Sequence, residues 1–333
     1  MHLNIYKIKE VDSSEKDKID KFLLDVDTNG EFINTIKYLS YHPKNRFIDD
    51  SIYIKDIDSG TIKCVLMAAS TDEQPQTIIS HPGTTFSGIV LNHKINIQEV
   101  KDIINLIESY YRIKYKYIII KLSPFIYHKQ PNQLLDYLLM KNKYIYGFTA
   151  LANVIDLSKI NGEEQIYNLY DSKRRNQVRK TIKDKQYEFL QLRKIEEPIW
   201  ENINKNLDLK YKATTTHSYT EIVSLSNKFP KNIVPYVVYK KGGQYGAFSL
   251  IYKFKNVFHT QYLDLNYELR NEYPNLYLIH NLIKMAINEG YRFFSFGAST
   301  ENEGNILNEG LFNFKNQFGG GSILLPKYTK KLI

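Results

Sequence analysis

Cysteine and tryptophan are almost absent from this chain of 333 residues, which contains one of each. A single cysteine, Cys64, excludes a disulfide within the chain and suits a reducing compartment. Because Cys64 lies in the strand-like run Ile62–Ala68, we interpret it as a small core residue rather than a reactive thiol.

Long apolar runs and targeting signals are missing as well. No stretch of about 18 uncharged apolar residues could span a membrane, and the N-terminus lacks the apolar region of a signal peptide. We therefore expect a soluble, cytoplasmic protein without an integral membrane segment.

Several common functional motifs do not occur. The H-x-x-x-H and C-x-x-C spacings are missing, so the sequence predicts no metal site. Neither a P-loop nor the G-x-S-x-G turn of serine hydrolases is found. The chemistry has to be sought in less specific patterns.

The chain does contain enough material for two folded domains, at about 150 residues each. Hydrophobic residues make up 43% of it, which allows real cores. The formal net charge of +9 favours anionic partners, which include phosphorylated small molecules, nucleic acid and anionic membrane surfaces.

Hydrophobic periodicity predicts the same order of elements in each half: helices, a strand meander, then strand–helix–strand. The expected helices include residues 97–112, 131–140, 163–184, 198–210, 218–227, 274–289 and 306–317. We predict an α+β fold of two tandem domains, 1–152 and 153–333, with mixed, mostly antiparallel sheets flanked by helices. A polar, glycine-containing stretch near 152–161 marks the boundary, just before a very basic helix.

The last forty residues hold the most informative pattern. Phe293–Ser299 reads as a short apolar strand that breaks at Gly297, and a polar turn follows. A short helix with one central lysine, Lys315, then ends at Gly319–Gly321. Buried strand ends that open onto polar loops are where α/β proteins keep their chemistry.

The second half has the element order of a GNAT domain. In GNAT members that use acyl-CoA, a Q/R-x-x-G-x-G/A loop binds the cofactor pyrophosphate at a helix N-terminus. The matching loop here is Arg270–Asn275, in which Tyr273 and Asn275 occupy the two small positions. Because tyrosine blocks the close backbone approach that glycine allows, we do not expect the usual acetyl-CoA cradle.

The whole chain resembles the FemAB-like branch of the GNAT superfamily, tandem-GNAT acyl- or aminoacyltransferases that include peptidoglycan-bridge enzymes. The resemblance rests on the two-domain length and on the segments Lys173–Lys180, Phe296–Ser299 and Phe314–Gly319. Further segments resemble a bacterial subgroup of uncharacterised acyltransferases associated with surface-polysaccharide loci: Ser80–Gly88, Ser123–His128 and Thr216–Ser218.

Two positions depart from the family pattern. Ser295 stands where the family strand usually has aspartate, and Ser123-Pro124 stands where the peptidoglycan-bridge enzymes carry Asp-Pro. If that aspartate is the catalytic base of the family, this chain has to use another group or none. Histidines at strand exits, His81 and His128, are our candidates, because a neutral imidazole can take a proton from an attacking ammonium.

The resemblance implies transfer of an acyl or aminoacyl group to an amine of an amino-sugar or cell-envelope precursor, as in polysaccharide biosynthesis. Lys315 would stabilise the oxyanion, and Phe314 would form a wall of the donor site. Arg175 and Arg179, four residues apart, would hold phosphates of a nucleotide-linked or lipid-linked sugar acceptor. The remaining expected substrate-binding residues are Ser299, Tyr127 and His217.

Two questions stay open at this point. The donor is either acyl-CoA, as in the wider superfamily, or aminoacyl-tRNA, which fits the positive charge. The alternative function is a non-catalytic protein, either a nucleic-acid-binding module that uses the basic helix or a scaffold built on a degenerate GNAT pair.

Overall fold

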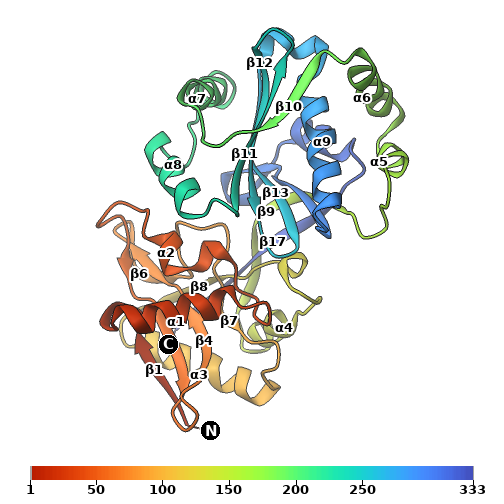
Figure 1. Ribbon diagram of the computed structural model, residues 1–333. Coiled ribbons are helices and arrows are strands. Elements are labelled where there is room, and N and C mark those ends of the chain that lie inside the picture. Colours follow the sequence, from red (N-terminus) through yellow and green to blue (C-terminus); the bar gives the residue numbers. More distant parts are fainter. Residues whose placement is uncertain (1, 333) are drawn as a thin grey trace. The chain divides into compact units, whose positions relative to one another are not determined.

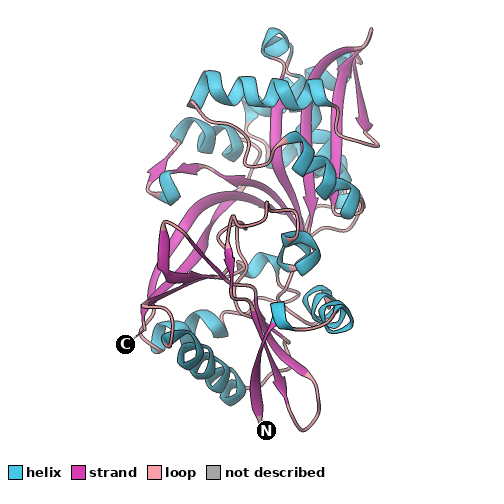
Figure 2. Cartoon of the chain, turned by 90° about the vertical axis from the view of Figure 1, so that its left-hand side faces the viewer, coloured by secondary structure: helices cyan, strands magenta, loops and turns pink. Residues whose placement is uncertain are grey.

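The computed structural model describes residues 2–332 and forms two compact units (Figures 1 and 2). Unit 1 takes the chain up to Ala150, together with residues 302–305 and the chain from Leu324 on. Unit 2 comprises residues 151–301 and 306–323. The predicted α+β class is confirmed. The predicted domains, 1–152 and 153–333, were continuous segments, whereas both units combine separate segments.

The described residues of unit 1 form two groups of strands and four α-helices. The order β1-β3-β4-β7 forms an antiparallel sheet, and β8 pairs with β6 in parallel and with β17 in antiparallel orientation. The elements are β1 (Leu3–Lys7), α1 (Ser13–Leu24), α2 (Ile36–Leu39), β2 (Ile48–Asp49), β3 (Ile52–Asp56), β4 (Ile62–Leu66), β5 (Ala69–Thr71), β6 (Gln74–Ile79), β7 (Val90–Leu91), α3 (Ile97–Arg112), β8 (Tyr117–Lys121) and α4 (Leu134–Lys141). The strands β9 (Ile145–Asp156) and β17 (Gly321–Lys331) each run along the chain from one unit into the other.

The crossover helix α3 forms where the sequence predicts it. Asn96 caps its start by accepting a hydrogen bond from the Glu99 amide, and the Glu99 side chain returns a bond to the Asn96 amide. The apolar residues at helical spacing, including Val100, Ile103 and Ile107, are buried in the core of unit 1.

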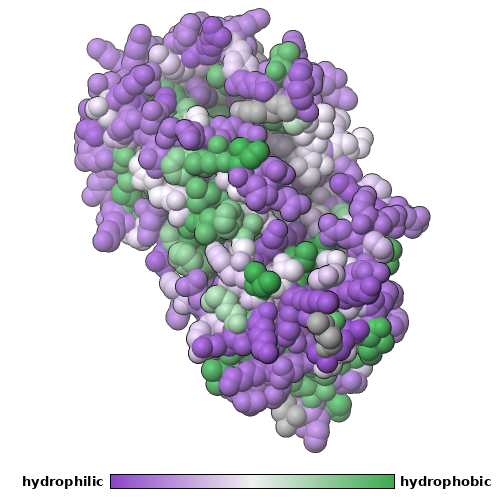
Figure 3. Space-filling view, turned by 180° about the vertical axis from the view of Figure 1, so that it is seen from behind, coloured by the Kyte–Doolittle hydropathy of each residue, from purple (hydrophilic) through white to green (hydrophobic). Residues whose placement is uncertain are grey.

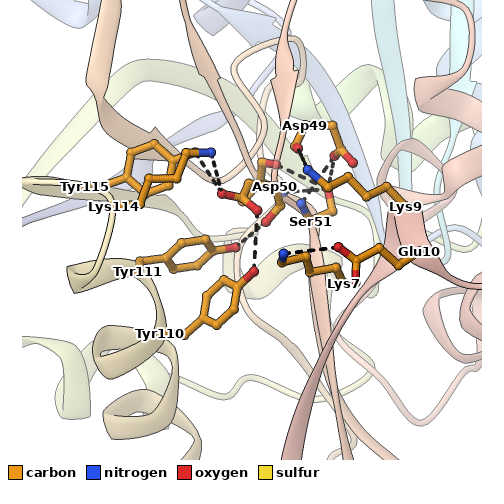
Figure 4. A network of polar contacts seen from close by, with 11 residues as sticks. Lys7, Lys9, Glu10, Asp49, Asp50, Ser51, Tyr110, Tyr111, Lys114 and Tyr115 are labelled. Atoms are coloured by element: carbon orange, nitrogen blue, oxygen red, sulfur yellow. Dashed lines mark hydrogen bonds and ion pairs between the residues drawn. The ribbon is translucent and has the colours of Figure 1, made fainter.

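A buried carboxylate ties the C-terminal end of α3 to the strands (Figure 4). The side chain of Asp50, which is 4% exposed, accepts hydrogen bonds from Tyr115 Oη at 2.9 Å and Lys114 Nζ at 3.1 Å. The hydroxyl of Tyr111 donates to the backbone carbonyl of Asp50 at 2.7 Å. Since a buried charge is tolerated only when it is paired, we interpret this network as structural.

In unit 2 the strand order is β10-β11-β12-β13-β14-β9, in which only β13 and β14 run parallel. Helix α9 packs on one face of this sheet, whereas α7 and α8 lie on the other (Figure 1). The elements are α5 (Glu163–Leu169), α6 (Ser172–Asp184), β10 (Tyr187–Gln191), α7 (Glu197–Tyr211), α8 (Tyr219–Lys228), β11 (Ile233–Lys240), β12 (Gln244–Lys253), β13 (Val257–Leu265), α9 (Pro274–Asn288), β14 (Phe293–Ala298), β15 (Thr300–Glu301), β16 (Ile306–Leu307) and α10 (Glu309–Asn316).

Two predicted helices of unit 2 are wrong in extent. The expected basic helix 163–184 is broken at Tyr170–Asp171, because the Asp171 side chain accepts from the Arg174 amide at 2.7 Å and starts a second helix. The expected helix 306–317 begins only at Glu309: Asn308 caps it, and the two residues before Asn308 form β16. Among residues 2–332, no helix is long and apolar enough to cross a membrane.

Candidate active site

The parallel strands β13 and β14 part after three residue pairs. Their pairing ends at His259 and Ser295, although β13 continues to Leu265 and β14 to Ala298. Each strand also carries an irregularity here, because Gln261 is skipped in the pairing with β12 and Phe296 in the pairing with β9. We call the region formed by His259–Gln261 and Ser295–Ser299 the fork.

Lys315 extends from α10 into the fork. Its side chain is buried, with 5% of the residue exposed, and Nζ donates to the carbonyl oxygens of Gly297 at 3.2 Å and Ala298 at 2.5 Å. Burial lowers the pKa of Lys315 to about 7. The lysine is therefore not a solvated surface residue, and near neutral pH its side chain exchanges between ammonium and neutral amine.

A histidine and a serine lie together at the last pair of the fork. His259 Nδ1 is 3.0 Å from Ser295 Oγ. The same oxygen accepts a hydrogen bond from the Gly297 amide at 3.2 Å. Burial and, second, the charge of Lys315 lower the pKa of His259 to about 4. The imidazole is thus neutral at pH 7. An aspartate in place of Ser295 would favour its charged form.

Gly297 allows the His259 ring to pack close to the backbone of β14. Its φ of +72° is a conformation that favours glycine, and an added Cβ would lie 3.2 Å from His259 Cε1. The apparent strand break at Gly297 in the sequence is therefore a bend within β14, which continues to Ala298.

Ser299 is fully buried and braces the end of β14. Its hydroxyl donates to Asn153 Oδ1 at 2.7 Å, and its amide donates to the Leu151 carbonyl at 2.8 Å. Within the described residues, the buried Nδ2 of Asn153 has no hydrogen-bond partner. Sequence reasoning missed Asn153, because it lies 146 positions away from Ser299 in a segment read as a domain boundary.

A row of polar residues continues from the fork along β13. Pairing with Tyr252, Leu250 and Phe248 of β12 places His259, Tyr262 and Asp264 on one face. The irregularity at Gln261 produces this arrangement, because simple alternation would turn Tyr262 away from the face of His259.

The predicted residue His217 belongs to this row. Its Nδ1 lies 2.8 Å from Tyr262 Oη, and the Trp200 ring packs edge-on against Tyr262 at 4.9 Å. Asp264 accepts hydrogen bonds from the side chains of Asn202, Asn206 and Tyr245, at 2.7, 2.7 and 2.6 Å. Asp264 therefore acts as a structural anchor for α7, whereas His217 lies on the same sheet face as the fork.

The predicted phosphate-binding arginines both have partners within unit 2. Arg175 donates to the Tyr170 carbonyl at 3.1 Å. Arg179 pairs with Glu164 at 2.8 Å and lies over the Tyr167 ring at 4.9 Å. A phosphate would have to compete with these contacts, and phosphate binding at Arg175 and Arg179 stays a prediction.

Their neighbour Arg174, which had no predicted role, reaches the helix of Lys315. Its guanidinium lies 5.1 Å from the Phe314 ring and 5.3 Å from the Phe318 ring, and it donates to the Gln317 side chain. Phe314, expected as a donor wall, packs against the core of unit 2 and faces this cation. The contact fixes α10 against α6.

The loop ahead of α9 has little capacity for a pyrophosphate. Pro274 has no amide hydrogen, and the amides of Leu276 and Tyr277 donate to the Tyr273 carbonyl at 3.0 and 3.3 Å. Glu272, just before the helix, pairs with Lys240 at 2.7 Å. The Tyr277 bond is the ordinary first bond of a helix, so it is the Leu276 amide that is withdrawn from an anion, and the missing acetyl-CoA cradle stays a prediction.

The other predicted residues belong to unit 1. His128 Nε2 lies 2.8 Å from Ser123 Oγ, at a cavity of about 70 Å³. Tyr127 is buried, with its ring 4.6 Å from Phe86. His81 does not line this cavity, so the structure does not bring the two candidate bases together. Residues around the cavity include Leu91, His93, Leu122, Ser123, His128 and Asp136.

Comparison with known proteins agrees with this architecture. Residues 205–315 match the family profile described as an acetyltransferase (GNAT) domain, a segment that includes β13, β14 and Lys315. No curated protein matches the chain.

Solved structures extend the likeness to the whole fold. FemX has a TM-score of 0.72 at 11% identity, covering 99% of this chain and 97% of FemX. A tandem GNAT protein from the clavulanic acid biosynthesis pathway has a TM-score of 0.58 at 9% identity, covering 100% and 99%. A conserved protein of unknown function from Bacteroides thetaiotaomicron has a TM-score of 0.56 at 15% identity, covering 98% and 99%. The chain thus has a tandem GNAT fold similar to that of FemX.

Proposed function

We propose that this protein is an N-acyl- or aminoacyltransferase that acts on an amine of an amino-sugar or cell-envelope precursor. The observation that carries the proposal is Lys315, a buried lysine without a carboxylate partner among the described residues. It lies where two parallel strands separate within a segment that matches a GNAT domain. A preplaced cation in such a site stabilises negative charge that develops on a carbonyl oxygen.

The proposed reaction is a direct attack. The amine nitrogen forms a bond to the donor carbonyl carbon, and the bond to the leaving group, a thiol or a ribose hydroxyl, breaks. Lys315 stabilises the oxyanion between these steps. The negative charge of the oxyanion favours the protonated form of Lys315. This effect opposes burial, which lowers the pKa of the lysine.

The attacking amine also has to lose a proton. His81 and His128 remain the candidate bases from the sequence, and both belong to unit 1. His259 is a further candidate in the fork. Its imidazole is neutral at pH 7, and the charge of Lys315 is close enough to lower its pKa. Each of the three can be tested by replacement with glutamine.

Of the two donors, aminoacyl-tRNA agrees better with the crowded N-terminus of α9. A CoA pyrophosphate needs backbone amides there, but Pro274 has none and that of Leu276 donates to the Tyr273 carbonyl. The net charge of +9 suits a polyanionic donor. Arg175 and Arg179 would then hold the phosphates of a nucleotide-linked or lipid-linked acceptor.

The central test compares Lys315→Met with the wild type. Radiolabelled acetyl-CoA and a mixture of aminoacyl-tRNAs serve as donors, and UDP-linked amino sugars serve as acceptors. Removing one oxyanion donor typically lowers the rate constant by roughly 10²–10³-fold, and we expect a loss of this size. Lys101→Met, which changes an exposed lysine of α3, is the matched control and should retain activity.

Circular dichroism has to show that Lys315→Met is folded. Full activity in a folded Lys315→Met protein would refute the oxyanion role. If no donor is used by the wild type while duplex or single-stranded RNA binds tightly, the nucleic-acid-binding alternative gains. The exposed lysines of α6, Lys173, Lys180 and Lys183, are the observation that favours it, and its affinity should fall steeply with salt.

A further inference from the structure

Ser299 is the last residue of the fork, and its amide, carbonyl and hydroxyl are all hydrogen-bonded within unit 2. The hydroxyl donates to Asn153 Oδ1 at 2.7 Å, and the amide donates to the Leu151 carbonyl at 2.8 Å. The carbonyl accepts a hydrogen bond from the Asn308 amide at 2.9 Å. Because the residue is 0% exposed, a substrate has no access to these groups. The role of Ser299 therefore lies in the elements that it connects.

The first of these elements is the helix that carries Lys315. Asn308 is the N-cap of α10, and its side chain accepts a hydrogen bond from the Leu311 amide at 3.0 Å. The amide of the same Asn308 donates to the Ser299 carbonyl. The start of α10 is thus joined directly to the end of β14, although residues 300–307 lie between them in the sequence. This bond sets where the helix begins relative to the strand.

The second element is β9, which lies beside β14 in the sheet. Asn153 of β9 pairs with Gly297 in antiparallel register. Gly297 and the following Ala298 supply the two carbonyls that accept from Lys315 Nζ. The hydrogen bond from Ser299 to Asn153 closes the strand pair immediately beyond these carbonyls. It therefore keeps them in place at a strand end that has already left its parallel partner β13.

The ammonium of Lys315 depends on these dipoles. His259 of β13 feels the charge of the lysine, but it is neutral at pH 7, since burial lowers its pKa to about 4. The adjoining helices carry Arg174, which stacks on Phe314, and Glu309 in the first turn of α10. Burial is the cause that lowers the pKa of Lys315 to about 7. A displaced strand end would admit water, and the pKa would return towards its ordinary value.

Asn153 is suited to hold this strand end. Within the described part of the chain its buried Nδ2 has no hydrogen-bond partner, which is a costly state for an amide. An apolar side chain would avoid that cost, but it could not accept the hydrogen bond from Ser299. An aspartate could accept the bond, but its charge beside the carbonyls of Gly297 and Ala298 would raise the pKa of Lys315. Position 153 thus calls for an uncharged acceptor.

We propose that the hydrogen bond between Ser299 and Asn153 is a brace that positions Lys315, so that Ser299 is a positioning residue instead of a substrate-binding one. The consequence for catalysis rests on the proposed function, whereas the brace itself rests on the contacts around Lys315. In the proposed reaction the brace holds the ammonium where the oxyanion develops. Misplacing such a group by about 1 Å can lower a rate by roughly 10²-fold.

The test measures the pKa of Lys315 in the full chain, without donor or acceptor. Protein with ¹³C-labelled lysine is titrated by NMR, and the Cε signal of Lys315 is assigned by its absence from Lys315→Met. Ser299→Ala and Asn153→Ala should each raise the midpoint of this signal by about one pH unit or more, because water reaches the ammonium. Since both changes remove the same bond, the double variant should show no larger shift than the stronger single variant.

The matched control is Ser226→Ala. The Ser226 hydroxyl of α8 is also buried and donates to the Ile233 carbonyl of β11 at 3.2 Å. Its removal should destabilise the protein to a similar extent and leave the midpoint of Lys315 unchanged. If Ser299 had only a structural role, the two serine variants would give the same result.

An unchanged midpoint in folded Ser299→Ala, or shifts that add in the double variant, would overturn the proposal. If Ser299→Ala does not fold, Asn153→Ala alone is compared with the control and has to show the raised midpoint. In a transferase assay, Ser299→Ala should lower kcat by roughly tenfold or more with little change in KM.

The brace and the proposed function can fail separately. Loss of transferase activity in Lys315→Met, together with an unchanged midpoint in Ser299→Ala, would refute the brace and leave the function standing. A raised midpoint in a protein that uses no donor would support the brace and count against the function alone.

Discussion

At the scale of the residue, Lys315 is held by geometry rather than by charge pairing. An ammonium removed from water needs compensation, and here two carbonyl dipoles at the end of β14 supply it. Those carbonyls are available because β14 has left its parallel partner. The same opening that exposes backbone groups therefore keeps the lysine in place.

Glycine decides the local path of the chain just after Lys315. Gly319 has a φ of +86°, and an added Cβ would lie 2.2 Å from the Leu169 carbonyl oxygen. We predict that Gly319→Ala lowers the free energy of unfolding by about 3 kcal/mol or more, since backbone strain and overlap with backbone atoms add. Urea denaturation measures the effect.

The matched control is Gly321→Ala, where no atom lies within 4 Å of the added Cβ and φ is not in the left-handed region. This change should alter the free energy of unfolding by less than about 0.5 kcal/mol. Equal effects of the two substitutions would show that contact with Leu169 does not limit position 319.

At the scale of the element, α6 and α10 form one support for the fork. Arg174 of α6 stacks on two phenylalanine rings and bonds to Gln317 at the end of α10. Arg179, one turn further along α6, makes an exposed ion pair with Glu164. The two arginines therefore have different roles despite their common basic helix.

This difference predicts unequal effects on stability. Arg174→Ala should lower the free energy of unfolding by about 1–2 kcal/mol, because it removes cation–π contacts and leaves Gln317 without its donor. Arg179→Ala should change it by less than about 0.5 kcal/mol, as is usual for exposed ion pairs. Thermal or urea unfolding of both variants tests the distinction, and a larger effect at Arg179 would contradict it.

At the scale of the whole molecule, the surface is largely hydrophilic, with apolar side chains in scattered patches on the face shown in Figure 3. The titratable groups that matter for stability are instead buried. Burial is the largest cause that lowers the pKa of His81 to about 3 and those of His259 and His280 to about 4.

These shifts predict how stability depends on pH. Between about pH 4 and the ordinary histidine pKa of 6.5, the unfolded chain binds more protons than the folded one, so stability falls as the pH is lowered. The pKa of Lys315 is about 7 in the folded protein, against an ordinary value of 10.5. Between these two values the unfolded chain again binds more protons than the folded one, so stability continues to rise with pH above neutrality.

We expect the free energy of unfolding to increase steadily from pH 4 to pH 9. Urea titrations at intervals of one pH unit measure it. Replacing Lys315 with Met should reduce the slope above pH 7, where Lys121 still contributes, and replacing His259 with Gln should reduce the slope below pH 6.5, where His81 and His280 still contribute. A profile of the wild type that is level across this range would contradict the burial of these groups.

Much of the fold could be predicted from local patterns. Helix α3 agrees with its predicted bounds, and the predicted meander is formed by β11, β12 and β13, with Gly242 and Gly243 in its first turn. The strands β9, β10 and β17 were missed. Strand β17, for example, pairs with β8, about two hundred residues earlier in the chain, and no local pattern reports such a partner.

The sequence by itself determined the α+β class and the tandem GNAT resemblance, and it singled out Lys315 as a candidate, because hydrophobic period, turn residues and short motifs are local properties. Only the tertiary structure decided what surrounds that lysine. His259, Asn153 and the bends at Gln261 and Gly297 come together through strand pairing between distant segments. The shifts that burial produces in pKa arise only once those segments exclude water together.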